Sequence, residues 1–201
     1  ACTSEVRDTC GGNRGGVAAA RRDAQLRFLR VATWNIAGGH RSAQAPEKYS
    51  LEDQRAAVVA EIRRWCSGVG CDVLVLQECE SKDGYADLQS THELAGSAKA
   101  EASRGFVHVY LRRGIGSSKR VELAGSVPCV AVEVRVKGDD GVVPLVVVGV
   151  HLPTGDAAGK RQRILQQVID GGGVEAERVI FAGDMNVKDD VWRKLMRDVR
   201  F

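Results

Sequence analysis

The chain has 201 residues, of which 44% are hydrophobic and 27% charged, a length and composition that fit one globular domain with a sizeable core. The formal net charge is +3, which tolerates an anionic substrate without demanding one. The most apolar run, Val142–Val150, is short and interrupted by Pro144 and Gly149, so the sequence excludes a membrane-spanning helix. The N-terminal residues also lack the apolar stretch of a signal peptide.

The first half of the chain predicts a leader, two strands and a helix. Residues 1–25 are rich in Gly and Arg, show no periodicity and predict a loose leader, while residues 26–201 are predicted as a single domain. Leu26–Trp34 predicts a strand, and a helix is expected to begin at Ser50. The continuous apolar run Val73–Leu76 is typical of a strand that is covered on both faces.

The second half predicts strands joined by a hairpin and a helix. In Val127–Val136 alternate valines share one face, whereas Glu133 and Arg135 lie on the other, and a hairpin turn is expected over residues 138–141. The remaining predicted elements are strands at Phe106–Leu111, Leu145–Val150 and Val179–Ala182, a helix from about Ala157 to Asp170, and a last helix capped by Asp189 or Asp190. Hairpins mixed with β-helix-β units indicate an α/β protein with two packed sheets.

Polar side chains stand where four apolar strands of this pattern end. They are Asn35, Glu78, His151 and the pair Asp184 and Asn186. Strands that end in this way place their polar residues on the rim of a sheet, where loops gather them into one site. Carboxylates that hold a cation, together with an amide and an imidazole that orient water and phosphate oxygens, are what metal-assisted attack on a phosphodiester requires.

These segments, in this order, resemble the endonuclease/exonuclease/phosphatase superfamily, which has the DNase I-like fold. The family motifs W-N, Q-E, H-L and G-D-x-N correspond to Trp34-Asn35, Gln77-Glu78, His151-Leu152 and Gly183-Asp184-Met185-Asn186, and the resemblance covers roughly Leu26 to Asp190. It implies a four-layer α/β sandwich of two packed mixed sheets. The stretch from Val179 to Asp190 is similar to the branch of phosphodiesterases that remove tyrosyl adducts from DNA 5′ ends.

The resemblance assigns a role to each strand-end residue. Glu78 corresponds to the principal Mg²⁺ ligand, with Mn²⁺ as an alternative ion, and Asn35 lies near the metal and hydrogen-bonds the acidic groups. Asp184 is expected to orient or deprotonate the attacking water, and Asn186 is expected to hold a non-bridging phosphate oxygen. If the backbone after Gly183 is extended, both of these side chains point the same way. A Gly-Asp turn that caps the last helix is the alternative interpretation of this pair.

The remaining candidate residues have basic side chains. His151 is expected to bind the substrate phosphate, although a lone His after a strand is more often structural. Lys188 corresponds to a basic residue that contacts phosphate in some relatives, and a surface lysine is an equally good interpretation. Lys160, Arg161 and Arg163 are expected on the solvated face of their helix.

One family feature is absent from these residues. Family members carry a Ser-Asp-His segment that supplies the general-base histidine, whereas no Asp-His pair occurs in this sequence and no histidine follows Asn186. The chain is therefore expected to be a C-terminally truncated fragment that is inactive alone. The resemblance implies a divalent-cation-dependent phosphoesterase that uses in-line attack of water; the alternative is a catalytically inactive interaction domain that retains the fold.

The expected partner is a phosphate-ester substrate, with nucleic acid, phosphoinositide and sphingolipid headgroups all open. Nothing in the sequence indicates an obligate protein partner. The six cysteines match no zinc template and are expected to be reduced structural thiols of an intracellular protein whose compartment the sequence does not specify.

Overall fold

The computed structural model describes residues 2–5, 29–36, 51–68, 70–100, 105–123, 129–138, 141–154, 158–170, 178–187 and 193. Four predictions lie wholly or largely outside the described residues, namely the loose leader over residues 6–25, Ser50 as the start of a helix, Lys188 as a phosphate contact, and the last helix with its cap at Asp189 or Asp190.

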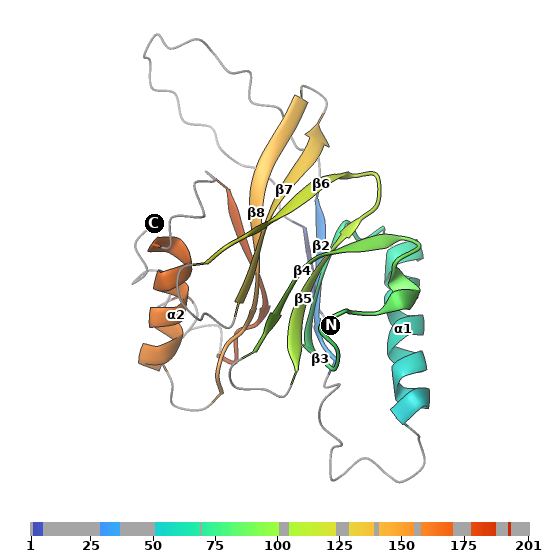
Figure 1. Cartoon of the computed structure of the whole chain (residues 1–201), viewed down its shortest axis with the longest axis horizontal. Helices are drawn as coiled ribbons and strands as arrows, with labels where there is room; N and C mark the ends of the chain where they lie inside the picture. Colours follow the sequence, from blue (N-terminus) through green and yellow to red (C-terminus); the bar gives the residue numbers. More distant parts are fainter. Residues whose placement is uncertain are drawn as a thin grey trace.

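The described strands form two mixed sheets, which we call sheet A and sheet B (Figure 1). Sheet A has the order β1-β2-β3-β5-β4, with β1 at Cys2–Glu5, β2 at Arg30–Asn35, β3 at Val73–Cys79, β4 at His92–Lys99 and β5 at Phe106–Arg112. Sheet B has the order β6-β7-β8-β9, with β6 at Gly116–Val121, β7 at Cys129–Gly138, β8 at Gly141–His151 and β9 at Val179–Asp184. A short 3-10 helix, Ala86–Leu88, precedes β4.

Two helices cover the outer faces of the sheets. Helix α1, Leu51–Gly68, packs on sheet A, and helix α2, Ala158–Asp170, packs on sheet B. The two helices lie on opposite sides of the molecule in Figure 1, so the layers run in the order α1, sheet A, sheet B, α2. This arrangement confirms the predicted four-layer α/β sandwich of two packed mixed sheets.

The central core lies between the two sheets and consists largely of valines. Its most deeply buried members are Val73, Val75, Val107 and Val109 of sheet A and Val130, Val132, Val134 and Val147 of sheet B. Burial of one such side chain stabilises the fold by about 1.5–3 kcal/mol. The alternation predicted for β7 is confirmed, because its even-numbered valines face this core while Glu133 is half-buried and Arg135 exposed.

Strands β1, β4 and β6 were not predicted from the sequence, because each lacks the alternation of apolar and polar residues that identifies a strand. In β4 the sequence H-E-L-A-G-S-A-K contains Gly96, where a Cβ atom would lie 2.6 Å from Cγ2 of Val130 in the facing sheet. Close approach of the sheets therefore requires glycine at this point. Strand β6, with the sequence G-S-S-K-R-V, is a polar edge strand.

The prediction of a loose leader over residues 1–25 is wrong for Cys2–Glu5. These residues form β1, which pairs antiparallel with β2 at the edge of sheet A. A strand ladder uses backbone N–H and C=O groups, so a short polar segment without periodicity can still complete a sheet edge. Among the described helices, none is long and apolar enough to cross a membrane.

Candidate active site

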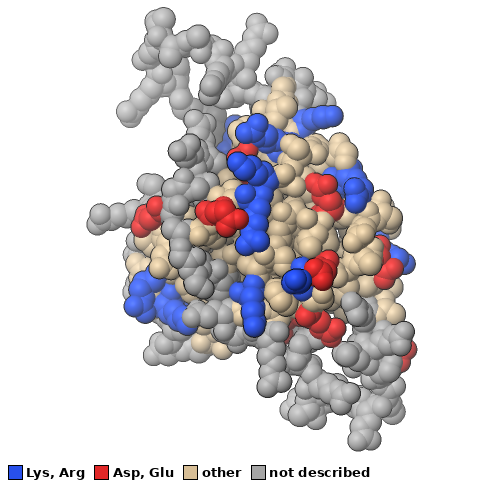
Figure 2. All heavy atoms as spheres, viewed as in Figure 1, with Lys and Arg blue, Asp and Glu red and all other residues tan. Residues whose placement is uncertain are grey.

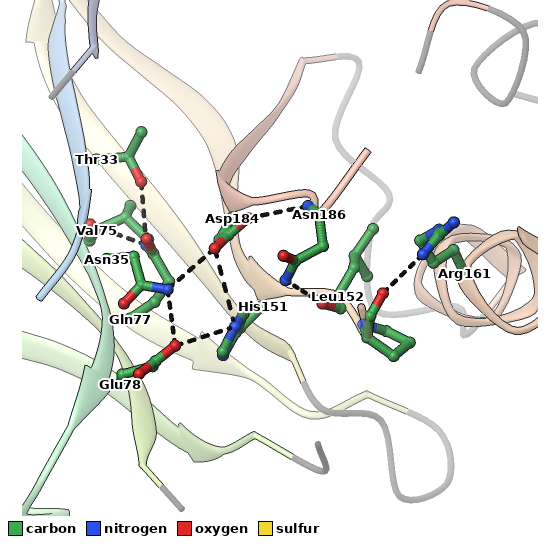
Figure 3. A network of polar contacts seen from close by, with 11 residues as sticks. Thr33, Asn35, Val75, Gln77, Glu78, His151, Leu152, Arg161, Asp184 and Asn186 are labelled. Atoms are coloured by element: carbon green, nitrogen blue, oxygen red, sulfur yellow. Dashed lines mark hydrogen bonds and ion pairs between the residues drawn. The ribbon is translucent and has the colours of Figure 1, made fainter. Parts of the chain in front are cut away.

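Two parallel strand pairs bring the predicted side chains to one edge of the sandwich. In sheet A, Asn35 at the end of β2 lies opposite Gln77 of β3, and in sheet B, His151 at the end of β8 lies opposite Asp184 of β9. Parallel strands end on the same side of their sheet, which is where α/β proteins gather polar side chains. Figure 3 shows the side chains of Asn35, Glu78, His151 and Asp184 converging between the two sheets.

The backbone of Glu78 has a left-handed conformation, with φ of 58°. The pairing of β3 with β5 shifts register between Leu76 and Cys79, so Glu78 lies in a β-bulge. A bulge of this kind re-aims a side chain at the end of a strand. Gly105 makes the bulge sterically feasible, because a Cβ atom there would lie 2.6 Å from the Cα atom of Glu78.

Asn35 connects the two carboxylates of the site. Its Nδ2 atom donates to Oε1 of Glu78 at 2.9 Å and to Oδ2 of Asp184 at 3.0 Å. An amide NH2 group carries two protons and can serve two acceptors at once. One side chain of sheet A thus holds a carboxylate from each sheet and offsets part of their mutual repulsion.

His151 faces the same pair of carboxylates from sheet B. Its Nε2 atom is 3.6 Å from Oε1 of Glu78 and 4.0 Å from Oδ2 of Asp184. The residue is only 6% exposed, and its Nδ1 atom has no hydrogen-bond partner among the described residues. A buried ring nitrogen of this kind is suited to hydrogen-bonding a bound polar group.

Asn186 is tied to the site through the backbone. Its N–H donates to Oδ1 of Asp184 at 2.9 Å, and its side-chain Nδ2 donates to the carbonyl of Leu152 at 2.6 Å. The φ angle of Asn186 is 48°, so the backbone is left-handed rather than extended. The side chains of Asp184 and Asn186 therefore do not point the same way as they would along an extended backbone. The hydrogen bond to the Leu152 carbonyl holds Asn186 against the segment after His151.

Two supporting residues were not assigned a role from the sequence. Gln77 is buried, and its Nε2 atom donates to Thr33 Oγ1 and to the Val75 carbonyl, both at 3.0 Å, which locks the ends of β2 and β3 together. Arg161 was expected on a solvated helix face, but it is buried and donates to the Pro153 carbonyl at 2.8 Å. Its long side chain reaches from α2 under the segment that follows His151, which helical periodicity alone does not indicate.

The donor set fits a hard divalent cation. Mg²⁺ takes oxygen ligands from one or two protein carboxylates and keeps most of its water, and Mn²⁺ accepts the same donors. Glu78 and Asp184 provide such oxygens on either side of the Asn35 amide. Within the part of the chain that the structure describes, no group of three or more His, Cys, Asp or Glu side chains forms an all-protein metal cage.

The structure therefore brings together most of the residues that the strand ends predicted. Asn35, Glu78, His151 and Asp184 share one cluster, and Asn186 is hydrogen-bonded to Asp184. Lys188 lies outside the described residues.

The chain belongs to the endonuclease/exonuclease/phosphatase family, because the model of that family matches residues 32–197. The family comprises hydrolases of the nuclease and phosphoesterase kind. No curated protein matches the sequence significantly.

Solved structures with the same fold come from this superfamily. The endonuclease/exonuclease/phosphatase from Bacteroides vulgatus is similar with a TM-score of 0.58 and 17% identity, over 82% of this chain and 69% of that chain. TDP2 from D. rerio complexed with single strand DNA product has a TM-score of 0.51 and 17% identity, over 84% of this chain and 64% of that chain. The human Nocturnin catalytic domain with bound sulfate anion has a TM-score of 0.51 and 19% identity, over 82% of this chain and 68% of that chain.

This chain spans 64% of the length of that TDP2 structure and 66% of a humanized D. rerio TDP2. At these identities the likeness establishes the shared DNase I-like fold.

Proposed function

We propose that the cluster at the strand ends forms the catalytic centre of a divalent-cation-dependent phosphoesterase. Such an enzyme hydrolyses a phosphodiester or phosphomonoester by in-line attack of water. The observation that carries the proposal is the Asn35 amide, which holds Glu78 of sheet A and Asp184 of sheet B beside the buried His151. Membership of a family of phosphoester hydrolases supports the same assignment.

In this mechanism each residue of the cluster has a separate task. Glu78 would hold Mg²⁺ or Mn²⁺, and the cation, when bound, would neutralise charge on the phosphate and on the leaving oxygen. Asp184 would orient the attacking water. His151 would hydrogen-bond a non-bridging phosphate oxygen, and Asn186 would do so through the Nδ2 proton that it does not donate to the Leu152 carbonyl. Lys188 would add a basic contact. Asn35 keeps the two carboxylates in place.

Single-stranded nucleic acid is the first substrate to test, because the D. rerio TDP2 structure contains a single strand DNA product. The sulfate anion bound to human Nocturnin has the tetrahedral shape of a phosphate group. On the face shown in Figure 2, basic and acidic side chains are interspersed, so the described part of this face does not present a broad basic surface to nucleic acid.

A catalytically inactive interaction domain is the second candidate. An inactive domain of this kind needs neither a metal nor a bound phosphate.

The two candidates are separated by metal binding and by chemical rescue. We expect the 201-residue chain to bind Mg²⁺ in calorimetry and to hydrolyse bis-p-nitrophenyl phosphate barely or not at all. Added imidazole, which acts as an external general base, is expected to raise that rate in the wild type and not in the Glu78→Gln variant. If the chain does not bind Mg²⁺ and imidazole does not change its rate of hydrolysis, the inactive domain is favoured.

A further inference from the structure

Two cysteines and a histidine meet at the end of sheet A that lies away from the candidate active site. Cys66 is in the last turn of α1, Cys71 precedes β3, and His92 is the first residue of β4. Glu78 lies near the opposite end of β3. This thiol cluster, formed by Cys66, Cys71 and His92, has no part in the mechanism proposed above.

The imidazole of His92 is oriented by its surroundings. The ring is fully buried, its Nε2 atom lies 3.1 Å from the Cys71 carbonyl, and its Nδ1 atom lies 3.0 Å from Thr91 Oγ1. A carbonyl oxygen only accepts hydrogen bonds, so Nε2 carries the proton. The same Nε2 atom is 3.7 Å from Sγ of Cys66, which places a hydrogen-bond donor against that sulfur.

The two thiols of the cluster differ in protonation. Hydrogen bonds from the Cys71 thiol and from His92 outweigh the burial of Cys66 and lower the pKa of its thiol to about 5. The same thiol–thiol hydrogen bond, together with burial, raises the pKa of Cys71. Burial raises the pKa of Cys79, and it raises that of Cys129 to about 12. The lowered pKa and the half-buried position favour Cys66 over Cys71, Cys79 and Cys129 as the nucleophile.

Cys66 and Cys71 both contact the His92 ring, Cys66 through its sulfur and Cys71 through its carbonyl oxygen. Cys66 and Cys71 are five residues apart in sequence, and Gly70 between them has φ of 72°, which turns the chain back from α1 into β3. Both residues are free thiols. The Cys71 thiol also lies 3.1 Å from the Val73 carbonyl, so joining the two sulfurs breaks one weak hydrogen bond.

We propose that Cys66 and Cys71 are an oxidative modification site whose substrate is a hydroperoxide. The Cys66 thiolate attacks the terminal peroxide oxygen, the O–O bond breaks, and an alkoxide or hydroxide leaves and is protonated to an alcohol or water. Cys66 becomes a sulfenic acid. The sulfur of Cys71 then attacks the Cys66 sulfur, water leaves, and a disulfide forms. Two thiols are oxidised and one peroxide is reduced.

The accessibility of the two sulfurs suits this sequence of steps. Cys66 is half-buried and therefore within reach of a small peroxide, whereas Cys71 is 3% exposed and shielded from it. The cluster also touches an aromatic pair that can report its state. Trp65, the neighbour of Cys66, lies with its ring centroid 5.2 Å from that of Trp34, which directly precedes Asn35.

The test treats the reduced 201-residue chain with hydrogen peroxide and maps its cysteine peptides by mass spectrometry. Cys2 and Cys10 are changed to Ser in all samples, so that other thiols do not form links. We expect loss of two hydrogen atoms per chain, a peptide pair joined through Cys66 and Cys71, and full reversal by a thiol reductant. Cys79 and Cys129 serve as internal controls and are expected to stay reduced.

Two variants separate the steps. In Cys71→Ser, Cys66 is expected to stop at the sulfenic acid, which dimedone traps. Cys66→Ser is expected to lower the rate of thiol oxidation at least roughly tenfold. Tryptophan fluorescence is expected to change on oxidation of the parent chain and not of Cys71→Ser.

The rate of alkylation by iodoacetamide gives a readout that does not depend on oxidation. For Cys66 it is expected to stay nearly constant between about pH 6 and about pH 8, whereas an ordinary thiol reacts about tenfold more slowly per unit of pH below its pKa. The proposal is overturned if Cys66 shows the ordinary slope, if disulfides form only between chains, or if Cys79 or Cys129 oxidises before Cys66.

Discussion

Asn35 and Glu78, which stand 43 positions apart, are joined by a hydrogen bond of 2.9 Å from Nδ2 to Oε1. The two residues come from the ends of neighbouring parallel strands, and the bulge in β3 turns Glu78 toward the amide. The carboxylate that we propose as the cation ligand is therefore oriented before any ion binds, which would lower the free-energy cost of binding.

The first prediction concerns the metal. Glu78→Gln is expected to lower the affinity for Mg²⁺ at least about tenfold, because a neutral amide oxygen replaces a carboxylate ligand. Calorimetric titration of both proteins measures the effect. Glu80→Gln is the matched control, since Glu80 is an exposed carboxylate two residues further along the chain. An unchanged affinity in Glu78→Gln would show that the cation is held elsewhere.

The second prediction concerns the bridging amide. Asn35→Asp replaces the donor between Glu78 and Asp184 with a third negative charge, so without metal the protein is expected to lose about 1–3 kcal/mol of stability. Mg²⁺ compensates that charge and is expected to raise the Tm of the variant more than that of the wild type. Thermal unfolding with and without Mg²⁺ measures both shifts, and equal shifts in the two proteins would contradict the bridge.

The third prediction concerns the left-handed backbone of Asn186. Asn186→Gly and Asn186→Ala both remove the hydrogen bond to the Leu152 carbonyl, but only alanine carries a Cβ atom that disfavours φ of 48°. The alanine variant is therefore expected to be less stable than the glycine variant by about 1 kcal/mol. Urea unfolding of the two variants measures the difference. Equal stabilities would mean that the backbone relaxes at this position.

The fourth prediction concerns the buried His108, whose pKa is lowered from 6.5 to about 4 by burial. In the unfolded chain this histidine takes up a proton near its ordinary pKa, whereas in the folded chain it does so only near pH 4. Stability is thus fully present above about pH 6.5 and is lost as the pH falls toward 4. From about pH 7 to about pH 5 the loss is expected to be about 2 kcal/mol.

His108→Gln is the comparison for that measurement, since glutamine does not titrate. Urea unfolding at both pH values is expected to show a smaller pH dependence in the variant than in the wild type. The Nδ1 atom of His108 lies 3.3 Å from the hydroxyl of Tyr110, so the variant also weakens that contact at both pH values. A pH dependence of the same size in both proteins would assign the effect to another group.

The sequence indicated the layers and the strand ends because both depend on local pattern. Valines at alternate positions identify β7, and an apolar run that ends on a polar residue identifies the rim of a sheet. The bulge at Glu78 and the Asn35 bridge depend on which strands become neighbours, and no local pattern contains that information. The thiol cluster has the same origin, because His92 joins the two cysteines only through the pairing of β4 in sheet A.

The buried position of Arg161 illustrates a related limit of local patterns. Its neighbours Lys160 and Arg163 are exposed, as helical periodicity predicts, whereas Arg161 turns inward to a carbonyl of the segment after His151. Only the path of that segment gives the guanidinium a buried partner. Charged residues are therefore the positions where periodicity and tertiary structure most readily disagree.

The candidate site takes Asn35 and Glu78 from sheet A and His151 and Asp184 from sheet B. Neither sheet alone contains a complete binding cluster, so a cation or phosphate that binds there can do so only when the sandwich is assembled. Such a ligand draws the folding equilibrium toward the native state in proportion to its concentration. Amide hydrogens along β2 and β9 are therefore expected to exchange more slowly with solvent when Mg²⁺ is bound. The exchange rate at the junction of the two sheets would then report whether the site is occupied.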